Sequence, residues 1–372
     1  MRPEVSFIFG GISTEYDSSV SSLENVISNY LGISNAKRPF NVKNIHHVSY
    51  KDGLVRTFPF SETFTMSDLH HVISGTATAQ GRTLVNALGE IASRNEYVVN
   101  LLHGQFGEDG GIQTLAALLG LKGTFGDPQV ASLTMNKYAM SSFVSSLLPS
   151  DIIMVPKTRL IKPNHNLDED HIANSFRGPI VVKPNSLGSS LLTEVFHEPA
   201  TAGREVVALV NEILKKDSAA LLQEYVRGDE YSCGCMIDSG DVISLPVMEI
   251  KTDRDFFGWK EKSRKDMFAL EAVDDHNKSI SDRIKSAARI IASAIDLYNI
   301  ARFDFIVTSR SEIVFLECNY IPGMGSQSIF PAMLEKNGMT VIDLIHWVIL
   351  HSKPYTRKSH LVRGKIDLQS PL

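Results

Sequence analysis

The sequence predicts an α/β protein of two or three domains that begins with an open parallel sheet. Residues 5–9 form a short apolar strand that leads straight into a glycine pair and a helical pattern, and residues 97–102 form a second buried strand before another glycine-rich turn. Strand, turn and helix in succession are the repeating unit of open α/β sheets. With 372 residues, the chain is long enough for more than one domain and a sizeable core.

Composition argues against several classes of protein. The net charge of −5 gives no general attraction to nucleic acid or to an anionic membrane. No apolar run approaches the length of a membrane span, and residues 1–4 lead into a strand rather than a signal peptide. Three cysteines are too few for a disulfide framework and indicate a reducing compartment, so we expect a cytoplasmic location.

The first glycine turn, at residues 10–15, lies at a place suited to an anionic group. Its glycines permit a tight turn, and the helix predicted to follow offers N–H groups at its start. The expected inner face of that helix is Val20, Leu23, Val26 and Ile27. Any open α/β sheet begins in this way, so this pattern alone assigns no function.

Residues 40–95 follow a less regular pattern. A strand is predicted from Val42 to Tyr50, whereas residues 58–79 have no clean period and are predicted to be irregular. Histidines occur as adjacent pairs at 46–47 and 70–71. Because adjacent side chains face different ways on a strand or a helix, we expect these histidines to be packing or surface residues rather than ligands.

The second glycine-rich turn, HGQFGEDGG at 103–111, follows the strand at 97–102 and precedes a helix predicted at 112–119. Ligands of an open parallel sheet bind beyond the carboxyl ends of its strands. His103 and Glu108 therefore lie where a substrate is expected. The alternative is an ordinary glycine-rich loop with a buried histidine.

A domain change is predicted near residue 128, followed by a single helix at 131–148. Further along, a strand at 179–184 carries Lys183 and leads into the loop Asn185–Ser190. A glycine- and serine-rich loop supplies N–H groups and hydroxyls to phosphate oxygens, and the lysine supplies positive charge. The loop lacks the GKS or GKT of a P-loop, and a flexible hairpin turn is the alternative interpretation.

The next strand, at 220–226, has an edge that could bind adenine, with the Glu230 carboxylate within reach of ribose hydroxyls. Another strand is predicted at 242–250. The charged loop at 251–266 is either a solvated excursion or a mobile lid that carries lysines to phosphates. An amphipathic helix then begins, with Ser281-Asp282 as its predicted cap.

Residues 301–319 predict a hairpin on which the chemistry depends. The alternation of the two strands places Arg302 with Asp304, and Glu317 with Asn319, on shared faces. Three oxygen-donor side chains beside an arginine suit Mg²⁺ and a phosphate-bearing substrate rather than zinc or copper. The alternative is an ordinary hairpin with one polar face in water. A tight Pro-Gly-Met-Gly loop follows at 322–325.

These pieces, in this order, resemble the D-alanine–D-alanine ligases of the ATP-grasp superfamily. The resemblance runs from about residue 10 to 350, and its most specific parts are HGQFGEDG at 103–110, KPNSLGSS at 183–190, RFD at 302–304 and ECNYIPGMGSQS at 317–328. It implies an α/β (α+β) protein of three domains with ATP held between the second and third. The implied boundaries are 1–128, 129–224 and 225–352, with a polar tail at 353–372.

The resemblance also implies a role for individual residues. The phosphates of ATP would be contacted by Lys137, Lys183, Ser189 and the lid residue Lys262. The adenine would lie against Gln223, Glu224 and Val226, and the ribose against Glu230. Two Mg²⁺ ions, or Mn²⁺ in their place, would be bound by Asp304, Glu317 and Asn319. Arg302 and the Gly323 N–H would stabilise the oxyanion, and the amino-acid sites would be formed by Glu15, His103, Ser189, Ser328 and Ile329.

The implied activity is ATP-dependent formation of D-alanyl-D-alanine, or a similar dipeptide, for peptidoglycan in the cell wall. The reaction would pass through an acyl phosphate and release ADP and phosphate. The resemblance further implies a homodimer with small amino-acid substrates. Two alternatives stay open: a biosynthetic ligase that joins another amino acid to a different amine or hydroxy acid, and a non-catalytic nucleotide-binding regulator. A nicotinamide dehydrogenase is poorly supported, because the first strand is not followed by GxGxxG.

Five positions depart from the family pattern and leave the substrate pair open. They are Ser263 for the tyrosine after the lid lysine, Leu192 for a glycine, Gly325 for a threonine, Asn136 for an aspartate and Ser18 for a valine.

Overall fold

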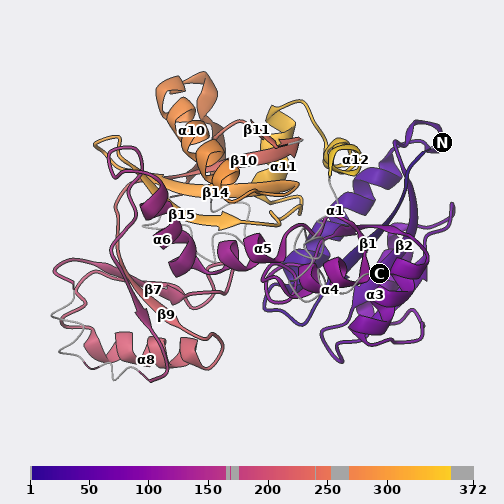
Figure 1. The fold of residues 1–372 in the computed structure, drawn as a ribbon, viewed down its shortest axis with the longest axis horizontal. Helices are drawn as coiled ribbons and strands as arrows, with labels where there is room; N and C mark the ends of the chain where they lie inside the picture. Colours follow the sequence, from indigo (N-terminus) through magenta and orange to yellow (C-terminus); the bar gives the residue numbers. More distant parts are fainter. Residues whose placement is uncertain (1, 165–167, 169–175, 239, 253–267, 353–372) are drawn as a thin grey trace, which may run out of the picture.

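The computed structural model describes residues 2–164, 168, 176–238, 240–252 and 268–352, in which the strands form three sheets (Figure 1). The predicted α/β architecture with a mostly parallel N-terminal sheet is confirmed. None of the described helices is long and apolar enough to cross a membrane.

The N-terminal sheet has the strand order β3-β2-β1-β4-β5. Its pairs are parallel except for β3, which runs antiparallel to β2 at one edge. The central strand β1 is buried from Val5 to Gly10 on both faces, which explains its unbroken apolar run. The strands are β1 (Glu4–Gly10), β2 (Asn41–Val48), β3 (Val55–Pro59), β4 (Tyr97–Asn100) and β5 (Lys122–Gly123).

Helices and a short 3-10 turn accompany this sheet: α1 (Tyr16–Gly32), η1 (Asn35–Lys37), α2 (Met66–Ser74), α3 (Leu84–Ser93) and α4 (Gly111–Leu119). The predicted helix after the second glycine turn is confirmed as α4, and Gly120 ends it in the left-handed conformation, with φ 65°. The prediction of an irregular segment at 58–79 is wrong in part. Thr65 and Asp68 form a capping box at the start of α2, and Gly75 ends that helix.

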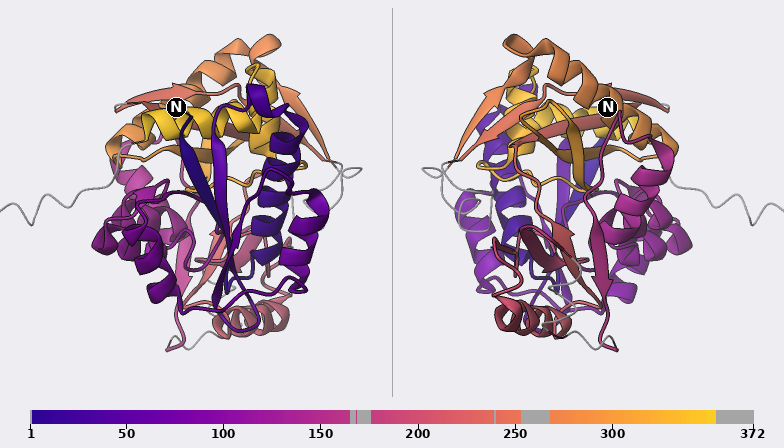
Figure 2. Two further views of the ribbon diagram at one scale, coloured as in Figure 1. Left: turned by 90° about the vertical axis from the view of Figure 1, so that its right-hand side faces the viewer. Right: turned by 90° about the vertical axis from the view of Figure 1, so that its left-hand side faces the viewer.

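The second sheet is antiparallel, with the order β6-β9-β7-β8, and α8 (Gly203–Leu214) packs against it. Figure 2 shows α8 at the opposite end of the molecule from α10 (Lys278–Ala294). The inner face of α8 is Val206, Val210 and Ile213, at helical spacing. The strands are β6 (Thr158–Ile161), β7 (Ile180–Pro184), β8 (Glu194–Phe196) and β9 (Ala220–Glu224).

The third sheet has the order β13-β12-β10-β14-β15, with β11 paired to β10, and α10 packs on it. Its strands are β10 (Asp229–Asp238), β11 (Asp241–Ser244), β12 (Met248–Lys251), β13 (Ala269–Ala272), β14 (Ile300–Val307) and β15 (Ile313–Asn319). The remaining described elements are α5 (Pro128–Met135), α6 (Lys137–Leu147), η3 (Val273–Asp275), α11 (Ile329–Lys336) and α12 (Val341–His351).

Three sequence predictions are corrected here. The helix predicted at 131–148 is two helices, because Asn136 leaves helical geometry and its side chain caps α6 by accepting from the Ala139 N–H. The strand predicted at 242–250 is two strands, β11 and β12. The cap of α10 is Asn277 rather than Ser281, whose hydroxyl instead donates to Asp274 at 2.6 Å from inside the helix.

The two ends of the chain share one hydrophobic core. Leu23 and Val26 of α1 belong to the same buried cluster as Phe330 of α11 and Leu344 of α12. This cluster also includes Met324, in the loop between β15 and α11. The first helix is therefore fixed against the segment that carries the last of the predicted site residues.

Candidate active site

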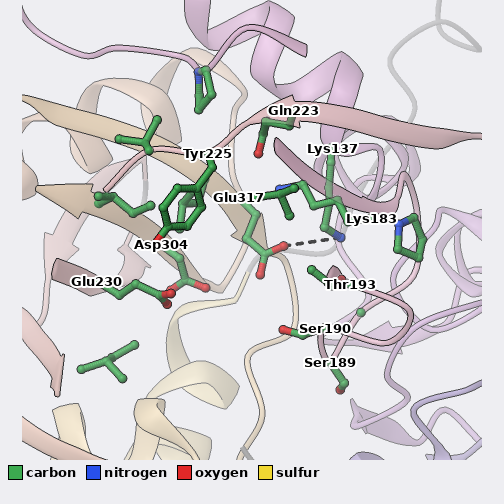
Figure 3. Close-up of a pocket in the computed structure, with 18 of the residues that line it drawn as sticks. Lys137, Lys183, Ser189, Ser190, Thr193, Gln223, Tyr225, Glu230, Asp304 and Glu317 are labelled. Atoms are coloured by element: carbon green, nitrogen blue, oxygen red, sulfur yellow. Dashed lines mark ion pairs between the residues drawn. The ribbon is translucent and has the colours of Figure 1, made fainter. Parts of the chain in front are cut away.

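A cleft lies between the second and third sheets, and its walls carry most of the predicted nucleotide and phosphate residues (Figure 3). It encloses about 1030 Å³ of space, including space open to solvent. The predicted residues that line it are Lys137, Lys183, Ser189, Gln223, Glu224, Val226, Glu230, Arg302, Asp304, Glu317 and Ile329. Residues more than 190 positions apart in the sequence thus meet in one cavity.

The β14–β15 hairpin brings the predicted metal ligands together. Asp304 is paired with Glu317, and Arg302 with Asn319, in the antiparallel register. Asn319 Nδ2 donates to Asp304 Oδ2 at 2.9 Å. The predicted hairpin and its shared polar face are confirmed, and the alternative of a solvated surface hairpin is excluded, because Arg302, Asp304 and Glu317 line the cleft.

Asp304 accepts hydrogen bonds from Arg302 and Ser232 as well as from Asn319. Arg302 donates to both of its carboxylate oxygens, at 2.9 and 2.8 Å, and Ser232 Oγ donates to Oδ1 at 2.5 Å. Burial alone would lower the pKa of Arg302, but the charge and hydrogen bonds of Asp304 outweigh it and raise that pKa. Arg302 is thus a permanent, fixed cation at the floor of the cleft.

Lys137 faces Glu317 because the preceding helix is broken. The Asn136 cap makes Lys137 the first residue of α6, and its N–H donates to the Asn185 carbonyl at 3.0 Å. Its Nζ donates to the Leu187 carbonyl at 2.8 Å and lies 3.4 Å from Glu317 Oε2. One ammonium therefore links the glycine- and serine-rich loop with the hairpin that carries the predicted metal ligands.

The donor set on the hairpin fits a hard cation. Asp304 and Glu317 supply carboxylates, and Asn319 supplies an amide that can turn its oxygen toward an ion. Among the described residues, no group of three or more His, Cys, Asp and Glu side chains could hold a metal. If Asp304 and Glu317 bind a metal ion, the third ligand from this hairpin would be the Asn319 amide.

The loop from Asn185 to Thr193 connects β7 with β8 and closes onto Glu15. Ser189 Oγ donates to Glu15 Oε1 at 2.9 Å, and a Cβ on Gly188 would lie 2.2 Å from that carboxylate, so a larger residue would have to displace the Glu15 side chain. Ser189, Ser190 and Leu192 all have left-handed φ values, of 53°, 54° and 52°. Leu192, where the family pattern has glycine, adopts a conformation that glycine adopts without strain.

A smaller pocket of about 390 Å³ adjoins the cleft and shares Lys137, Gly188 and Glu317 with it. Glu15, Glu108 and Asn319 also line this pocket. Burial, and then the charge of Glu108, raises the pKa of Glu15. The pocket is acidic and buried, which suits a small ligand that brings its own positive charge.

His103 lies behind this pocket rather than on its wall. Its Nε2 is 3.0 Å from Ser22 Oγ, and its Nδ1 is 3.7 Å from Glu108 Oε2. Burial acts to lower the pKa of His103, but the nearby carboxylate of Glu108 and the charge of Glu15 raise it overall. Glu108 also accepts from the N–H groups of Gly104 and Ile321, at 2.8 and 2.9 Å.

Gly323 and Ser328 lie together in the loop between β15 and α11. Ser328 is the residue before α11, and its side chain makes no capping hydrogen bond. A Cβ on Gly323 would lie 3.1 Å from Ser328 Oγ. Lys262 and Ser263, the predicted lid residues, lie outside the described residues.

Sequence reasoning missed two groups of residues at the site. Tyr225, Ser190 and Thr193 also line the cleft, although the patterns around them single out their neighbours. Ser232 bonds Asp304 from β10, and Ser22 bonds Met324 from α1. The pairing of β10 with β14 reveals Ser232, but no local pattern in the sequence does.

Two antiparallel sheets that enclose a cleft lined by lysines and carboxylates define an ATP-grasp fold. The family model described as D-ala D-ala ligase C-terminus matches residues 149–350, which is more than half of the chain. The chain therefore belongs to the D-alanine–D-alanine ligase family.

Known proteins that are similar to it include two D-alanine–D-alanine ligases and a D-Ala:D-Ser ligase. A D-alanine–D-alanine ligase from Prochlorococcus marinus (strain MIT 9215) is 27% identical over 361 residues, covering 92% of this chain and 96% of that one. The VanG D-Ala:D-Ser ligase from Enterococcus faecalis matches with a TM-score of 0.74 at 23% identity, covering 94% and 99%. A D-alanine–D-alanine ligase from Bacillus anthracis complexed with ATP matches at 0.64 and 20%, covering 94% and 97%.

Proposed function

We propose that this protein joins the carboxylate of one D-alanine to the amine of a second D-alanine, or of a close relative, at the expense of ATP. The observation that carries this proposal is the junction of two cavities. A large cleft with lysines and metal-ligating oxygens meets a small acidic pocket at Lys137, Gly188 and Glu317. A phosphoryl donor and a small amino acid can therefore meet there.

The reaction needs two steps because a carboxylate is a poor electrophile. Transfer of the γ-phosphoryl group from ATP to the first amino acid gives an acyl phosphate and ADP. The amine of the second amino acid then attacks the acyl carbon, and the tetrahedral intermediate loses phosphate as the amide bond forms. This protein's part is to hold the groups in line and to stabilise the charge that develops.

Lys137 and Lys183 contact the phosphates of ATP, and Ser189 contributes its hydroxyl from the adjoining loop. Asp304, Glu317 and Asn319 would hold Mg²⁺, which supplies neutralisation of phosphate charge when bound. The adenine lies against Gln223, Glu224 and Val226, with the ribose at Glu230. The B. anthracis relative was solved with ATP, which supports this use of the cleft.

Glu15 binds the ammonium of the first amino acid. The raised pKa of Glu15 supports this role, because an incoming cation relieves the cost of a buried carboxylate beside Glu108. Arg302 and the Gly323 N–H stabilise the oxyanion, an effect worth about 10²-fold or more in rate for each donor. Ser328, which makes no capping hydrogen bond, binds the carboxylate of the second amino acid.

Release of ADP across a panel of D- and L-amino acids and hydroxy acids tests the proposal. We expect release that depends on D-alanine, with the dipeptide detected by mass spectrometry. ATP binding without turnover on any pair would overturn the proposal and favour a nucleotide-binding regulator.

A different second substrate is the other candidate, and the loop beside Ser328 favours it. Gly325 replaces the family's threonine, and a Cβ there would lie 2.5 Å from Ser21 Oγ and 3.3 Å from Ser328 Oγ. The surroundings of the acceptor therefore differ from the family pattern, and the VanG relative is described as a D-Ala:D-Ser ligase. Competition between D-alanine and D-serine in the same assay decides which of the two is the preferred second substrate.

The cytoplasmic location and the homodimer both stay predictions. Sedimentation of the purified protein tests whether it is a dimer.

A further inference from the structure

The backbone N–H groups on either side of Gly323 are engaged, whereas its own is not. The Ile321 N–H donates to Glu108 Oε1 at 2.9 Å, and the Met324 N–H donates to Ser22 Oγ at 3.0 Å. Pro322 has no N–H. Among the described residues, no acceptor is paired with the Gly323 N–H. The loop therefore presents one unpaired donor between two fixed ones.

The two groups that fix the loop are joined through His103. Its ring lies between Ser22 Oγ, 3.0 Å from Nε2, and Glu108 Oε2, 3.7 Å from Nδ1. All three residues are buried, with His103 only 3% exposed. We propose that Ser22, His103 and Glu108 form a clamp that positions the Gly323 N–H toward the oxyanion, an inference that rests on the proposed function.

The donors and acceptors of Ser22 and His103 can be assigned without conflict. Ser22 Oγ gives its single hydrogen to the Ser18 carbonyl at 2.8 Å, so its contacts with Met324 and His103 both use its lone pairs. His103 must then carry a hydrogen on Nε2. Its Nδ1, at 3.7 Å from Glu108, is at ion-pair rather than hydrogen-bond distance.

Glu108 uses both carboxylate oxygens on backbone N–H groups. Oε2 accepts from Gly104, in the turn that carries His103, and Oε1 accepts from Ile321. One side chain thus fixes the spacing between the loop after β4 and the loop after β15. His103, expected from the family resemblance to touch the substrate, is given a positioning role by this arrangement.

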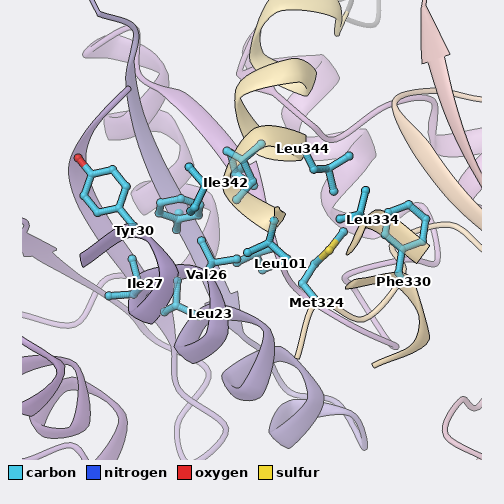
Figure 4. Packing of buried hydrophobic residues seen from close by; sticks show 14 of the residues in the cluster. Leu23, Val26, Ile27, Tyr30, Leu101, Met324, Phe330, Leu334, Ile342 and Leu344 are labelled. Atoms are coloured by element: carbon cyan, nitrogen blue, oxygen red, sulfur yellow. The ribbon is translucent and has the colours of Figure 1, made fainter. Parts of the chain in front are cut away.

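Packing supports the clamp from the other side of the loop. Figure 4 shows Met324 directed into the core beside Leu101, close to Leu23 and Val26 of α1. Asn25 Nδ2 of the same helix donates to the Met324 carbonyl at 2.7 Å. Met324 is therefore held by its side chain, its N–H and its carbonyl, whereas the Gly323 N–H has no acceptor within the described part of the chain.

A clamp is needed because residue 323 is glycine, whose backbone is flexible. A glycine backbone samples more conformations than any other residue, so an N–H on Gly323 is directed only if its neighbours are fixed. An oxyanion donor works by being preorganised before the charge develops. Release of either neighbour would leave ATP binding intact and slow the step in which the oxyanion forms.

Ser22→Ala tests the clamp, with Ser28→Ala as the matched control on the exposed face of the same helix. We expect Ser22→Ala to lower kcat by on the order of 10²-fold, with KM for ATP within about twofold of the parent. Scrambling of ¹⁸O between the bridging and non-bridging positions of ATP, which reports phosphoryl transfer, should persist. A purely structural role would lower net turnover and isotope scrambling together, and that result would overturn the proposal.

Glu108→Gln and Glu108→Ala give a second, independent comparison. The amide keeps one acceptor for the Ile321 N–H, so we expect Glu108→Gln to retain more kcat than Glu108→Ala. Equal losses would count against the clamp. This pair also covers the case in which Ser22→Ala does not fold.

Hydrogen exchange of the ligand-free protein separates the clamp from the proposed function. Mass spectrometry of a peptide covering residues 320–328 should show faster exchange in Ser22→Ala than in the parent or in Ser28→Ala. Unchanged exchange would mean that Ser22 does not hold the loop. An inactive parent would overturn the proposed function, while the exchange result still decides whether the segment is held.

Discussion

Glu317 lies where the two cavities of the site meet. It lines both cavities, is paired with Asp304 across the hairpin and lies 3.4 Å from Lys137 Nζ. Its side chain sits on the strand surface rather than in the hydrophobic core. Loss of its carboxylate should therefore affect chemistry far more than folding.

Glu317→Ala should lower the rate of dipeptide formation by on the order of 10³-fold or more, because a proposed metal ligand and the partner of Lys137 are lost together. Circular dichroism should show an unchanged fold and a melting temperature within a few degrees of the parent. Glu312→Ala, in the turn of the same hairpin, is the control and should stay active. A Glu317→Ala enzyme as fast as its parent would refute the proposed chemistry.

Because Glu15 must be ionised to bind an ammonium, we expect affinity for the first amino acid to depend on pH. Its pKa is raised, chiefly by burial and by Glu108, and the hydrogen bond from Ser189 partly offsets that rise. Binding of an ammonium needs the carboxylate form, so affinity for the first amino acid should fall as pH drops through this pKa. Removing the Ser189 hydroxyl raises the pKa further, so the fall in Ser189→Ala should begin at a higher pH.

The pH profile of kcat/KM for the first amino acid in the two proteins measures this effect. The acid limb of Ser189→Ala should be displaced to higher pH than that of the parent. Identical limbs would show that another group controls binding.

At the level of helices and loops, the contact between α1 and the loop before α11 is unusually close. A Cβ on Gly325 would lie 2.5 Å from Ser21 Oγ, well inside van der Waals contact. With any other residue at position 325, the loop or the Ser21 side chain would have to move. Ser328 follows shortly after, so any displacement of the loop moves the proposed acceptor site.

Gly325→Ala should consequently raise KM for the second amino acid several-fold. The double variant Gly325→Ala with Ser21→Ala removes the obstructing hydroxyl and should recover most of the loss. Steady-state kinetics of the four proteins form a double-mutant cycle. Additive losses, with no recovery in the double variant, would argue against the steric explanation.

The sequence predicted the parts of the site that occur as short contiguous patterns. Asp304, Glu317 and Asn319 follow from strand alternation, and Gly120 is readable as a helix end. Ser22 and Ser232 were not predictable, because their partners lie 302 and 72 residues away and the contacts exist only after the elements pack. The short α2 was missed because its nine residues cover little more than two turns, too short a stretch for a helical period to stand out from the irregular sequence around it.

Across the molecule, the N-terminal sheet is not an independent body. The buried face of α1 belongs to the same core cluster as residues of α11 and α12, so part of the first predicted domain is completed by the last elements of the chain. The boundary expected near residue 128 separates the first sheet from the other two, but it does not separate the hydrophobic cores.

A fragment of residues 1–128 should therefore lack a sharp cooperative thermal transition, because the part of the shared core that α11 and α12 cover would be left in water. Joining residues 329–352 to that fragment through a flexible linker should restore part of the transition. Calorimetry of the two fragments measures this difference. A sharp melt of the shorter fragment alone would contradict it.

The bond between Ser22 and Met324 spans 302 positions in the chain. On a ribosome that adds about 5–20 residues per second, α1 leaves the exit tunnel roughly 15–60 s before its partner loop exists. Throughout that interval α1 can pack on its own sheet, but the part of the shared core that α11 and α12 complete is still missing. We therefore expect aggregation under heat or overproduction to start from chains that are still being synthesised, before this long-range contact forms.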